Sequence, residues 1–193
     1  MKLAILVIDM LKDFIEGPLS SPRFKKVIPC ISKLINWARE RGIPVIYVND
    51  SHIPEVDREL KLWGPHAIRG SPGAEVISEL KPSEKDFVVL KRRYSGFYAT
   101  ELDTLLRELS VDTLVLTGIS TDVCVLHTAA DAFFRNYELI VVEDCVEAFT
   151  EEGHRWALEY MKKIYGAKIM KSEELIKEFQ NMQTNNQFEP QHS

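Results

Sequence analysis

Short aliphatic runs alternate along this chain with longer segments in which apolar residues recur at helical spacing. The first run, Leu3–Ile8, is aliphatic throughout, which is typical of a strand buried on both faces of a parallel sheet. The next segment places apolar residues on one helical stripe between Phe24 and Ala38, and Gly42 ends it. Repetition of this unit predicts an α/β fold: a doubly wound, mainly parallel sheet of about six strands with helices on both faces, a Rossmann-like three-layer sandwich.

The remaining segments fit the same scheme. Ser21-Pro22 has the form of an N-cap followed by proline at the first helical position. The stretch from Asp50 to Pro82 is rich in proline and glycine, so we expect a long functional loop with one short helix near residues 74–80. We expect a single domain over residues 1–180 and a polar, disordered tail over 181–193. Further strands are expected at residues 43–48, 87–90, 113–116, 139–142 and 167–170.

Composition restricts the partners. The 193 residues carry a formal net charge of −5, and no basic cluster suggests nucleic acid or an anionic membrane. The apolar run at the N-terminus is too short for a signal peptide or a membrane span, so we expect a cytoplasmic protein that acts on a small molecule. The three cysteines, Cys30, Cys124 and Cys145, are odd in number and widely spaced, which favours free thiols in a reducing compartment.

Three reactive side chains come at the ends of predicted strands. Asp9 follows the first strand, Lys91 ends the third, and Cys124 lies in the first helical turn after the fourth. Taken singly, each has an ordinary alternative: a loop cap, a solvated basic turn and a buried structural thiol. Because the carboxyl ends of parallel strands lie along one edge, we expect the three to converge as base, cation and nucleophile. A helix N-terminus and a nearby lysine both favour a thiolate at Cys124. Cys30 and Cys145 are interpreted as structural thiols.

A second constellation consists of Asp50, His52 and His66. A carboxylate and an imidazole two residues apart, with a distal imidazole, can bind a divalent ion, with Zn²⁺ the best match, and leave coordination positions open. The alternative is two ordinary loop histidines. His127 and His154 lie on predicted helices and are interpreted as structural.

Three ordered motifs carry a family resemblance. They are Val7-Ile-Asp9-Met-Leu-Lys-Asp13-Phe14, Lys91-Arg-Arg-Tyr94-Ser-Gly-Phe97 and Thr117-Gly-Ile-Ser-Thr-Asp-Val-Cys124. Together they resemble the isochorismatase-like cysteine hydrolase superfamily over residues 2–171. The resemblance implies an Asp9–Lys91–Cys124 triad, and a cis peptide between Ile119 and Ser120. It also implies an oxyanion site formed by the amides of Ser120 and Cys124.

Within that superfamily, nicotinamidases have a metal site that matches Asp50, His52 and His66. They hold the pyridine ring among aromatic residues that correspond here to Phe14 and Trp63, and Tyr94 of the second motif is assigned to substrate binding with them. The resemblance also implies a homodimer or homotetramer.

The resemblance predicts a cysteine-dependent amidohydrolase that releases ammonia from a small amide or ureido group through a thioester. Nicotinamidase-like activity is the first expectation. Ala67 departs from the cysteine that nicotinamidases commonly have at this position. The short Arg92-Arg93 spacer resembles N-carbamoylsarcosine amidases and ureidoacrylate-type hydrolases more, so an N-carbamoylsarcosine amidase or a ureidoacrylate- or biuret-type hydrolase is the alternative. An isochorismatase and a non-catalytic domain are the rival hypotheses. A nucleotide-binding protein is disfavoured because no strand is followed by a glycine-rich phosphate-binding motif.

Overall fold

A computed structural model describes residues 1–186, with the side chains of residues 1–181. It contains one six-stranded sheet, and every pairing in it is parallel. The fold class predicted from the alternating pattern is therefore confirmed. The strands are β1 (Leu3–Ile8), β2 (Val45–Asp50), β3 (Phe87–Lys91), β4 (Thr113–Ile119), β5 (Glu138–Glu147) and β6 (Lys168–Met170).

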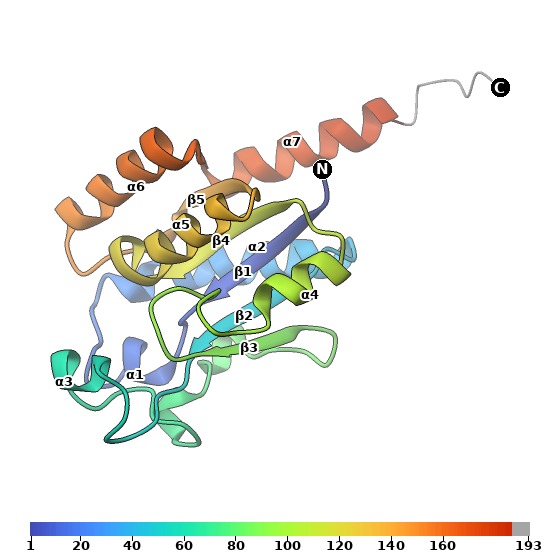
Figure 1. Cartoon of the computed structure of the whole chain (residues 1–193). Coiled ribbons are helices and arrows are strands. Elements are labelled where there is room, and N and C mark those ends of the chain that lie inside the picture. Colours follow the sequence, from blue (N-terminus) through green and yellow to red (C-terminus); the bar gives the residue numbers. More distant parts are fainter. Residues whose placement is uncertain (187–193) are drawn as a thin grey trace.

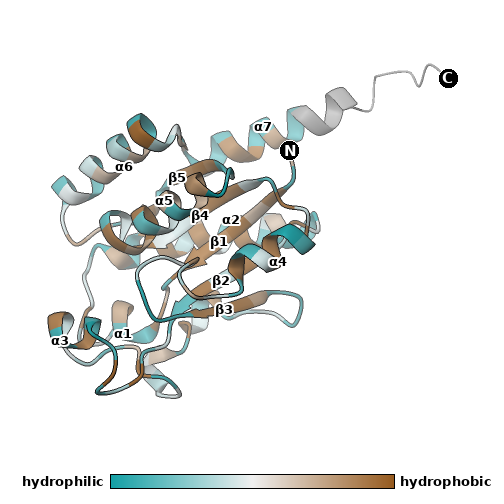
Figure 2. Ribbon diagram, viewed as in Figure 1, coloured by the Kyte–Doolittle hydropathy of each residue, from teal (hydrophilic) through white to brown (hydrophobic). Residues whose placement is uncertain are grey.

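Helices cover both faces of the sheet (Figure 1). One face carries α4 (Leu102–Glu108), α5 (Leu126–Phe134) and α6 (Glu151–Tyr165); the other carries α2 (Ile28–Glu40) and α7 (Ser172–Asn186). Two short helices, α1 (Lys12–Ile15) and α3 (Glu59–Trp63), belong to the loops beyond the strand ends. Figure 2 shows apolar residues concentrated in the strands and polar residues on the outer helix surfaces, as burial of a sheet on both faces requires.

The strand order is β3-β2-β1-β4-β5-β6, so the chain changes direction between β1 and β4. Crevices that bind ligands in doubly wound sheets form beyond the carboxyl ends of the strands at such a point. β1 is buried at all six positions because it lies in the middle of the sheet. The residues that follow β1 and β4 are thereby held at the ends of two central strands that are buried at every position.

Several local expectations need correction. The N-cap predicted at Ser21 is wrong: a 3₁₀ turn (Phe24–Val27) precedes α2, and the proline in the first turn of α2 is Pro29. The short helix expected at 74–80 is replaced by two 3₁₀ turns, Pro72–Ala74 and Ser78–Leu80. Helix α7 continues to Asn186, so residues 181–186 of the expected disordered tail are helical, and residues 187–193 lie outside the described part.

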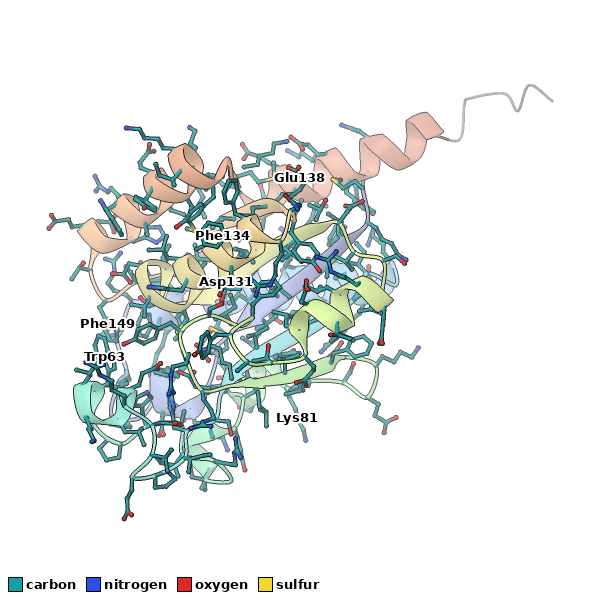
Figure 3. The ribbon with its side chains drawn as sticks, viewed as in Figure 1. Trp63, Lys81, Asp131, Phe134, Glu138 and Phe149 are labelled. Carbon is teal, nitrogen blue, oxygen red and sulfur yellow. A yellow bond between two sulfur atoms is a disulfide. The ribbon has the colours of Figure 1, made fainter. Side chains whose placement is uncertain are left out.

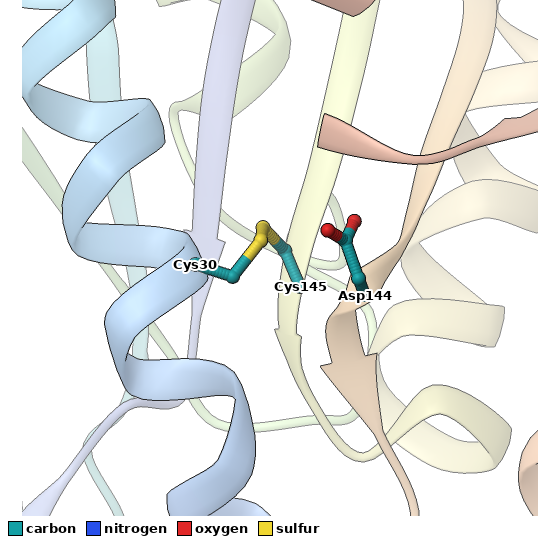
Figure 4. Close-up of side chains that lie close together, drawn as sticks. All are labelled: Cys30, Asp144 and Cys145. Carbon is teal, nitrogen blue, oxygen red and sulfur yellow. A yellow bond between two sulfur atoms is a disulfide. The ribbon is translucent and has the colours of Figure 1, made fainter. Parts of the chain in front are cut away.

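The expectation of three free thiols is also wrong. Cys30 on α2 and Cys145 on β5 form a disulfide, with their Cα atoms 5.4 Å apart, and the bridge ties α2 to the sheet (Figure 4). The neighbouring Asp144 accepts hydrogen bonds from the backbone and hydroxyl of Ser172, which anchors the start of α7. The two cysteines are 115 residues apart in sequence, and no spacing rule reveals a pair that the sheet brings together. Cys124 is the one cysteine with a free thiol.

Among residues 1–186, none of the helices combines the length and the apolar character that a membrane span requires.

Candidate active site

The three residues predicted at the strand ends lie in one buried pocket. Asp9 follows β1, Lys91 is the last residue of β3, and Cys124 lies in a π-helical turn (Thr121–Val125) that joins β4 to α5. Asp9 has a φ of 53°, in the left-handed region that L-residues rarely adopt. Such backbone strain concentrates at functional sites, where the surrounding structure enforces it.

Lys91 is the centre of the cluster. Its Nζ lies 2.8 Å from an Asp9 carboxylate oxygen and 2.5 Å from Asp50 Oδ1, and it is 3.5 Å from the sulfur of Cys124. All four side chains are buried, so water screens these charges weakly. The backbone N–H of Asp50 donates a hydrogen bond to Asp9 Oδ1 at 2.7 Å. The sequence assigned Asp50 only to a metal, but the structure shows that it pairs with Lys91 as well.

Burial and charge set the protonation states. Burial, together with the charge of Asp50, raises the pKa of Asp9 to about 6 despite the opposing effect of Lys91. Burial raises the pKa of the Cys124 thiol well above its usual range, and Lys91 does not reverse this because Asp9 and Asp50 oppose it. Contrary to the expected stabilisation of a thiolate, these surroundings favour the protonated thiol, and the Asp9 carboxylate beside it can accept the proton.

The backbone around the nucleophile is constrained by β1. Gly118 has a φ of 104°, and a Cβ at this position would overlap the carbonyl oxygen of Ile8. Only glycine meets both conditions. The peptide bond between Ile119 and Ser120 is cis, as the resemblance implied. The hydroxyl of Ser120 donates to Asp122 at 2.5 Å, which fixes the turn that leads to Cys124.

The predicted metal-binding residues also converge. Ligand atoms of Asp50, His52 and His66 all lie within 4.8 Å of one another, and the three residues are buried. Nδ1 of His52 lies 3.3 Å from Asp57 Oδ2, and a carboxylate only accepts, so neutral His52 carries its proton on Nδ1. Its Nε2, which points toward Asp50, is buried and has no hydrogen-bond partner in the described part of the chain. An orphaned imidazole nitrogen beside a carboxylate is the donor set that a divalent cation requires.

Two acidic residues at this cluster were missed by the sequence analysis. Asp57 holds His52 and also pairs with Arg92, whose nitrogen atoms lie 2.5–3.2 Å from the carboxylate oxygens. Glu59, the first residue of α3, has a carboxylate oxygen 3.7 Å from His52 Nε2. Burial and the charge of Asp50 raise the pKa of Glu59 to about 7. The only signal in the sequence is that both are acidic residues shortly after His52. Acidic residues are common in loops, so this signal is weak.

Asp13 anchors the long loop that carries His66. The carboxylate of Asp13 accepts a hydrogen bond from the backbone N–H of Ala67 at 2.8 Å. A Cβ on Gly73 would overlap the same carboxylate, so the chain passes as close to Asp13 as backbone permits. Asp13 therefore fixes the position of the residue that follows His66.

An apolar pocket opens beside the nucleophile, and the three residues predicted to bind substrate, Phe14, Trp63 and Tyr94, all line it. The Trp63 Nε1–H donates to the Tyr94 hydroxyl at 3.0 Å, and the Trp63 ring lies nearly parallel to that of Phe149 (both labelled in Figure 3), with centroids 6.2 Å apart. Phe149 comes from the loop after β5 and was not predicted. The lining is Asp9, Phe14, Leu19, Phe24, Asp50, Glu59, Trp63, His66, Tyr94, Ile119, Ser120, Val123, Cys124 and Phe149.

The remaining histidines are held by local contacts. Nδ1 of His127 on α5 lies 2.7 Å from the carbonyl oxygen of Val123, which belongs to the π-helical turn before that helix. Nδ1 of His154 lies 3.0 Å from the hydroxyl oxygen of Thr121. Neither lies among the groups that could bind the metal with Asp50. Their interpretation as structural histidines agrees with these contacts.

Comparison with known proteins identifies relatives of the whole domain. Residues 3–174 match the family model described as the isochorismatase domain. The structure of an N-carbamoylsarcosine amidase from Thermoplasma acidophilum is 46% identical and superimposes with a TM-score of 0.84, covering 89% of this chain and 97% of that one. The structure of nicotinamidase PncA from Bacillus subtilis is 34% identical, with a TM-score of 0.85 over 89% of this chain and all of that one.

A third similar structure was solved with a metal. It is a pyrazinamidase of Pyrococcus horikoshii in complex with zinc, which is 30% identical, has a TM-score of 0.82, and covers 89% of this chain and 99% of that one.

Proposed function

The chain belongs to the isochorismatase family of hydrolases, and on this basis we propose that it cleaves the C–N bond of a small amide through a thioester on Cys124. One observation carries the proposal: a buried free thiol, an ammonium and a carboxylate of raised pKa meet beside an apolar pocket. A nucleophile with an adjacent base is the arrangement that covalent catalysis requires.

The reaction begins with transfer of the Cys124 proton to Asp9. The sulfur then forms a bond to the substrate carbonyl carbon, and the backbone amides of Ser120 and Cys124 hold the oxyanion. Lys91, which is fixed by Asp9 and Asp50, stabilises the negative charge on sulfur. Asp9 returns the proton to the nitrogen, the C–N bond breaks and ammonia leaves. Water, deprotonated by Asp9, then hydrolyses the thioester and regenerates the thiol.

Asp50, His52 and His66 would hold a divalent cation, with Zn²⁺ the best match for two imidazoles and a carboxylate. Glu59 lies close enough to His52 to join them. When bound, such an ion supplies a Lewis acid or an ordered water molecule next to the substrate. The family resemblance and the zinc complex of the pyrazinamidase support this assignment.

The pocket favours nicotinamide as the substrate. Phe14, Trp63 and Phe149 provide flat apolar surfaces suited to an uncharged ring. The lining residues include no arginine and no lysine, and Lys91 behind them is already paired with two carboxylates. A substrate that carries its own carboxylate, such as N-carbamoylsarcosine or ureidoacrylate, would therefore find no arginine or lysine among these lining residues with which to pair.

N-Carbamoylsarcosine amidase activity is the second candidate. It is favoured by the 46% identity to the Thermoplasma acidophilum enzyme and by the short Arg92-Arg93 spacer. The carboxylate argument and the identity argument therefore predict different substrates, and a single assay separates them.

Ammonia release should be measured on nicotinamide, pyrazinamide, N-carbamoylsarcosine, a ureidoacrylate analogue and biuret. We expect the highest kcat/KM with nicotinamide or pyrazinamide, and a preference for N-carbamoylsarcosine would overturn the pocket argument. Cys124→Ala should abolish turnover and leave the thermal midpoint within a few degrees of the parent. A Cys124→Ala variant that keeps most of its activity would rule out the thioester route and favour a different chemistry.

A further inference from the structure

The turn that carries Cys124 is weakly restrained by its own hydrogen bonds. It is π-helical, which is a rare and wide backbone conformation. The N–H groups of Val123 and Val125 both donate to the carbonyl oxygen of Ser120, each at 3.1 Å, whereas each N–H of a regular α-helix has an acceptor of its own. A displacement of about 1 Å can lower the rate of a reaction about 100-fold. The contacts that hold this turn from outside therefore matter for the position of the sulfur.

The start of helix α6 packs directly against the turn. Gly153 lies in the first turn of α6, and a Cβ at this position would be 2.5 Å from Oδ2 of Asp122, which is too short for a non-bonded contact. The other oxygen of that carboxylate accepts the hydroxyl of Ser120. The N–H of Gly153 donates to the side chain of Thr150, which caps the helix. This close approach brings the next residue of α6, His154, within reach of the turn.

His154 forms a hydrogen bond with the first residue of the turn. Its Nδ1 lies 3.0 Å from Oγ1 of Thr121. Thr121 is completely buried and precedes Cys124 by three residues. Within residues 1–181, the hydroxyl of Thr121 has no other hydrogen-bond partner. A single imidazole on α6 therefore satisfies the buried polar group at the point where the turn leaves the cis peptide.

Glu147 orients this imidazole. Its Oε1 lies 3.7 Å from Nδ1 of His154, and it accepts hydrogen bonds from Arg23 Nη2 and from the backbone N–H of Ala148, both at 2.9 Å. These two bonds fix the carboxylate at the end of β5. A carboxylate only accepts hydrogen bonds, so its charge favours the tautomer of His154 that has its proton on Nδ1. In that tautomer the imidazole donates and the hydroxyl of Thr121 accepts.

We propose that His154 is a positioning residue for the nucleophile. Its hydrogen bond to Thr121 holds the π-helical turn in the conformation that places Sγ of Cys124 beside Asp9, and Glu147 keeps the imidazole in its donating form. His154 is absent from the lining of the pocket, so it acts through the turn and not on the substrate. The inference rests on the proposed role of Cys124 as the nucleophile.

Two pairs of variants separate the hydrogen bond from packing. Thr121→Val keeps the shape of the side chain and removes the acceptor, whereas Thr121→Ser keeps the hydroxyl. His154→Leu removes the donor, whereas His154→Asn keeps an N–H near the position of Nδ1. Activity is measured on nicotinamide, or on the amide that the ammonia-release panel selects.

The expected result is a change in kcat and not in KM. Thr121→Val and His154→Leu should lower kcat about 10–100-fold and leave KM within about threefold of the parent value, because the turn moves and the pocket does not. Thr121→Ser and His154→Asn should keep most of the parental kcat. The matched control is Thr113→Val, which removes the hydroxyl of another buried threonine at the opposite end of β4 and should keep the parental kcat.

The reactivity of Cys124 gives a second readout that needs no substrate. Cys124 has the one free thiol of the protein, so its alkylation by iodoacetamide can be followed directly. The rate constant of alkylation should fall in Thr121→Val and His154→Leu, because a displaced sulfur loses the base beside it. The Thr121→Val/His154→Leu double variant should react no more slowly than the slower single variant, since both changes remove the same hydrogen bond.

The outcomes separate this inference from the proposed function. Parental kcat and parental alkylation in Thr121→Val overturn the inference. Equal losses in the two members of each pair also overturn it, because the effect would then be one of packing. If Cys124→Ala keeps its activity while alkylation still depends on the Thr121 hydroxyl, the thioester route fails and the positioning of Cys124 stands. Circular dichroism confirms that each variant is folded, and either pair alone is sufficient for the comparison.

Discussion

Removal of the Cys30–Cys145 disulfide is a quantitative test of the structure. The bridge closes a loop of 115 residues, and the chain-entropy relation for a loop of this length gives about 4.8 kcal/mol of stabilisation at room temperature. For a chain of this size, each kcal/mol corresponds to about 2–4 °C in the thermal midpoint, so loss of the bridge should lower Tm by roughly 10–19 °C. Most of this effect acts on the unfolded chain, which gains freedom when the bridge is absent.

The decrease in Tm can be measured by scanning calorimetry. The samples are the oxidised parent, the fully reduced parent, Cys30→Ala, Cys145→Ala and the double variant. The two single variants and the double variant should lose nearly the same amount, because either change removes the whole bridge and the effects are not additive. The double variant should be slightly less stable than Cys30→Ala, since Cys145 is fully buried and its truncation leaves a small void. Cys124→Ala is the control, because it removes a cysteine outside the bridge and should keep the parental midpoint.

Two results would refute this reasoning. Titration of thiols in the denatured, unreduced protein should give one reactive thiol, that of Cys124, and three would show that the bridge does not form. If one thiol is found and reduction nevertheless shifts Tm by less than about 3 °C, the bridge forms but the loop-entropy account of its stabilisation is wrong.

Three further predictions follow from the site. Asp9 must be ionised to accept the thiol proton, and its pKa is raised to about 6. The value of kcat/KM should therefore fall about tenfold for each pH unit below 6. A kcat/KM that does not change with pH in this range would contradict the role of Asp9 as base. Asp57→Asn should weaken zinc binding about 10–100-fold in a chelator competition, because Asp57 orients His52. The control, Asp86→Asn, alters a carboxylate that pairs with Arg39 and should leave zinc affinity unchanged. Equal zinc affinities of the two variants would exclude Asp57 as the residue that orients His52. Gly118→Ala should lower the unfolding midpoint far more than Gly42→Ala, because both have positive φ but only Gly118 abuts the Ile8 backbone, and similar midpoints would refute the packing argument.

The site predicted from the sequence depended on topology rather than on local geometry. Asp9, Lys91 and Cys124 could be grouped because each follows or ends a strand and parallel strands share one carboxyl edge. The same reasoning placed Asp50 there, but gave it only one role. That its carboxylate is shared between Lys91 and the metal-binding residues depends on distances of a few ångströms, which no spacing rule specifies.

The direction of the Cys124 pKa shift illustrates the same limit. A helix start and a lysine favour a thiolate, and both features can be seen in the sequence. The structure adds burial and two carboxylates next to the sulfur, and these outweigh the lysine. The opposing effects of burial, lysine and carboxylates on the thiol pKa depend on distances within the fold, so their balance is decided only after folding.

The sequence by itself determined where strands and helices alternate along the chain, because strand and helix periodicities are local and strong. Because parallel strands share one carboxyl edge, that pattern also grouped Asp9, Lys91 and Cys124. Only the tertiary structure decided the Cys30–Cys145 pairing and the contributions of Asp57, Glu59 and Phe149. Each of these depends on contacts between segments far apart in the chain, which local sequence patterns do not specify.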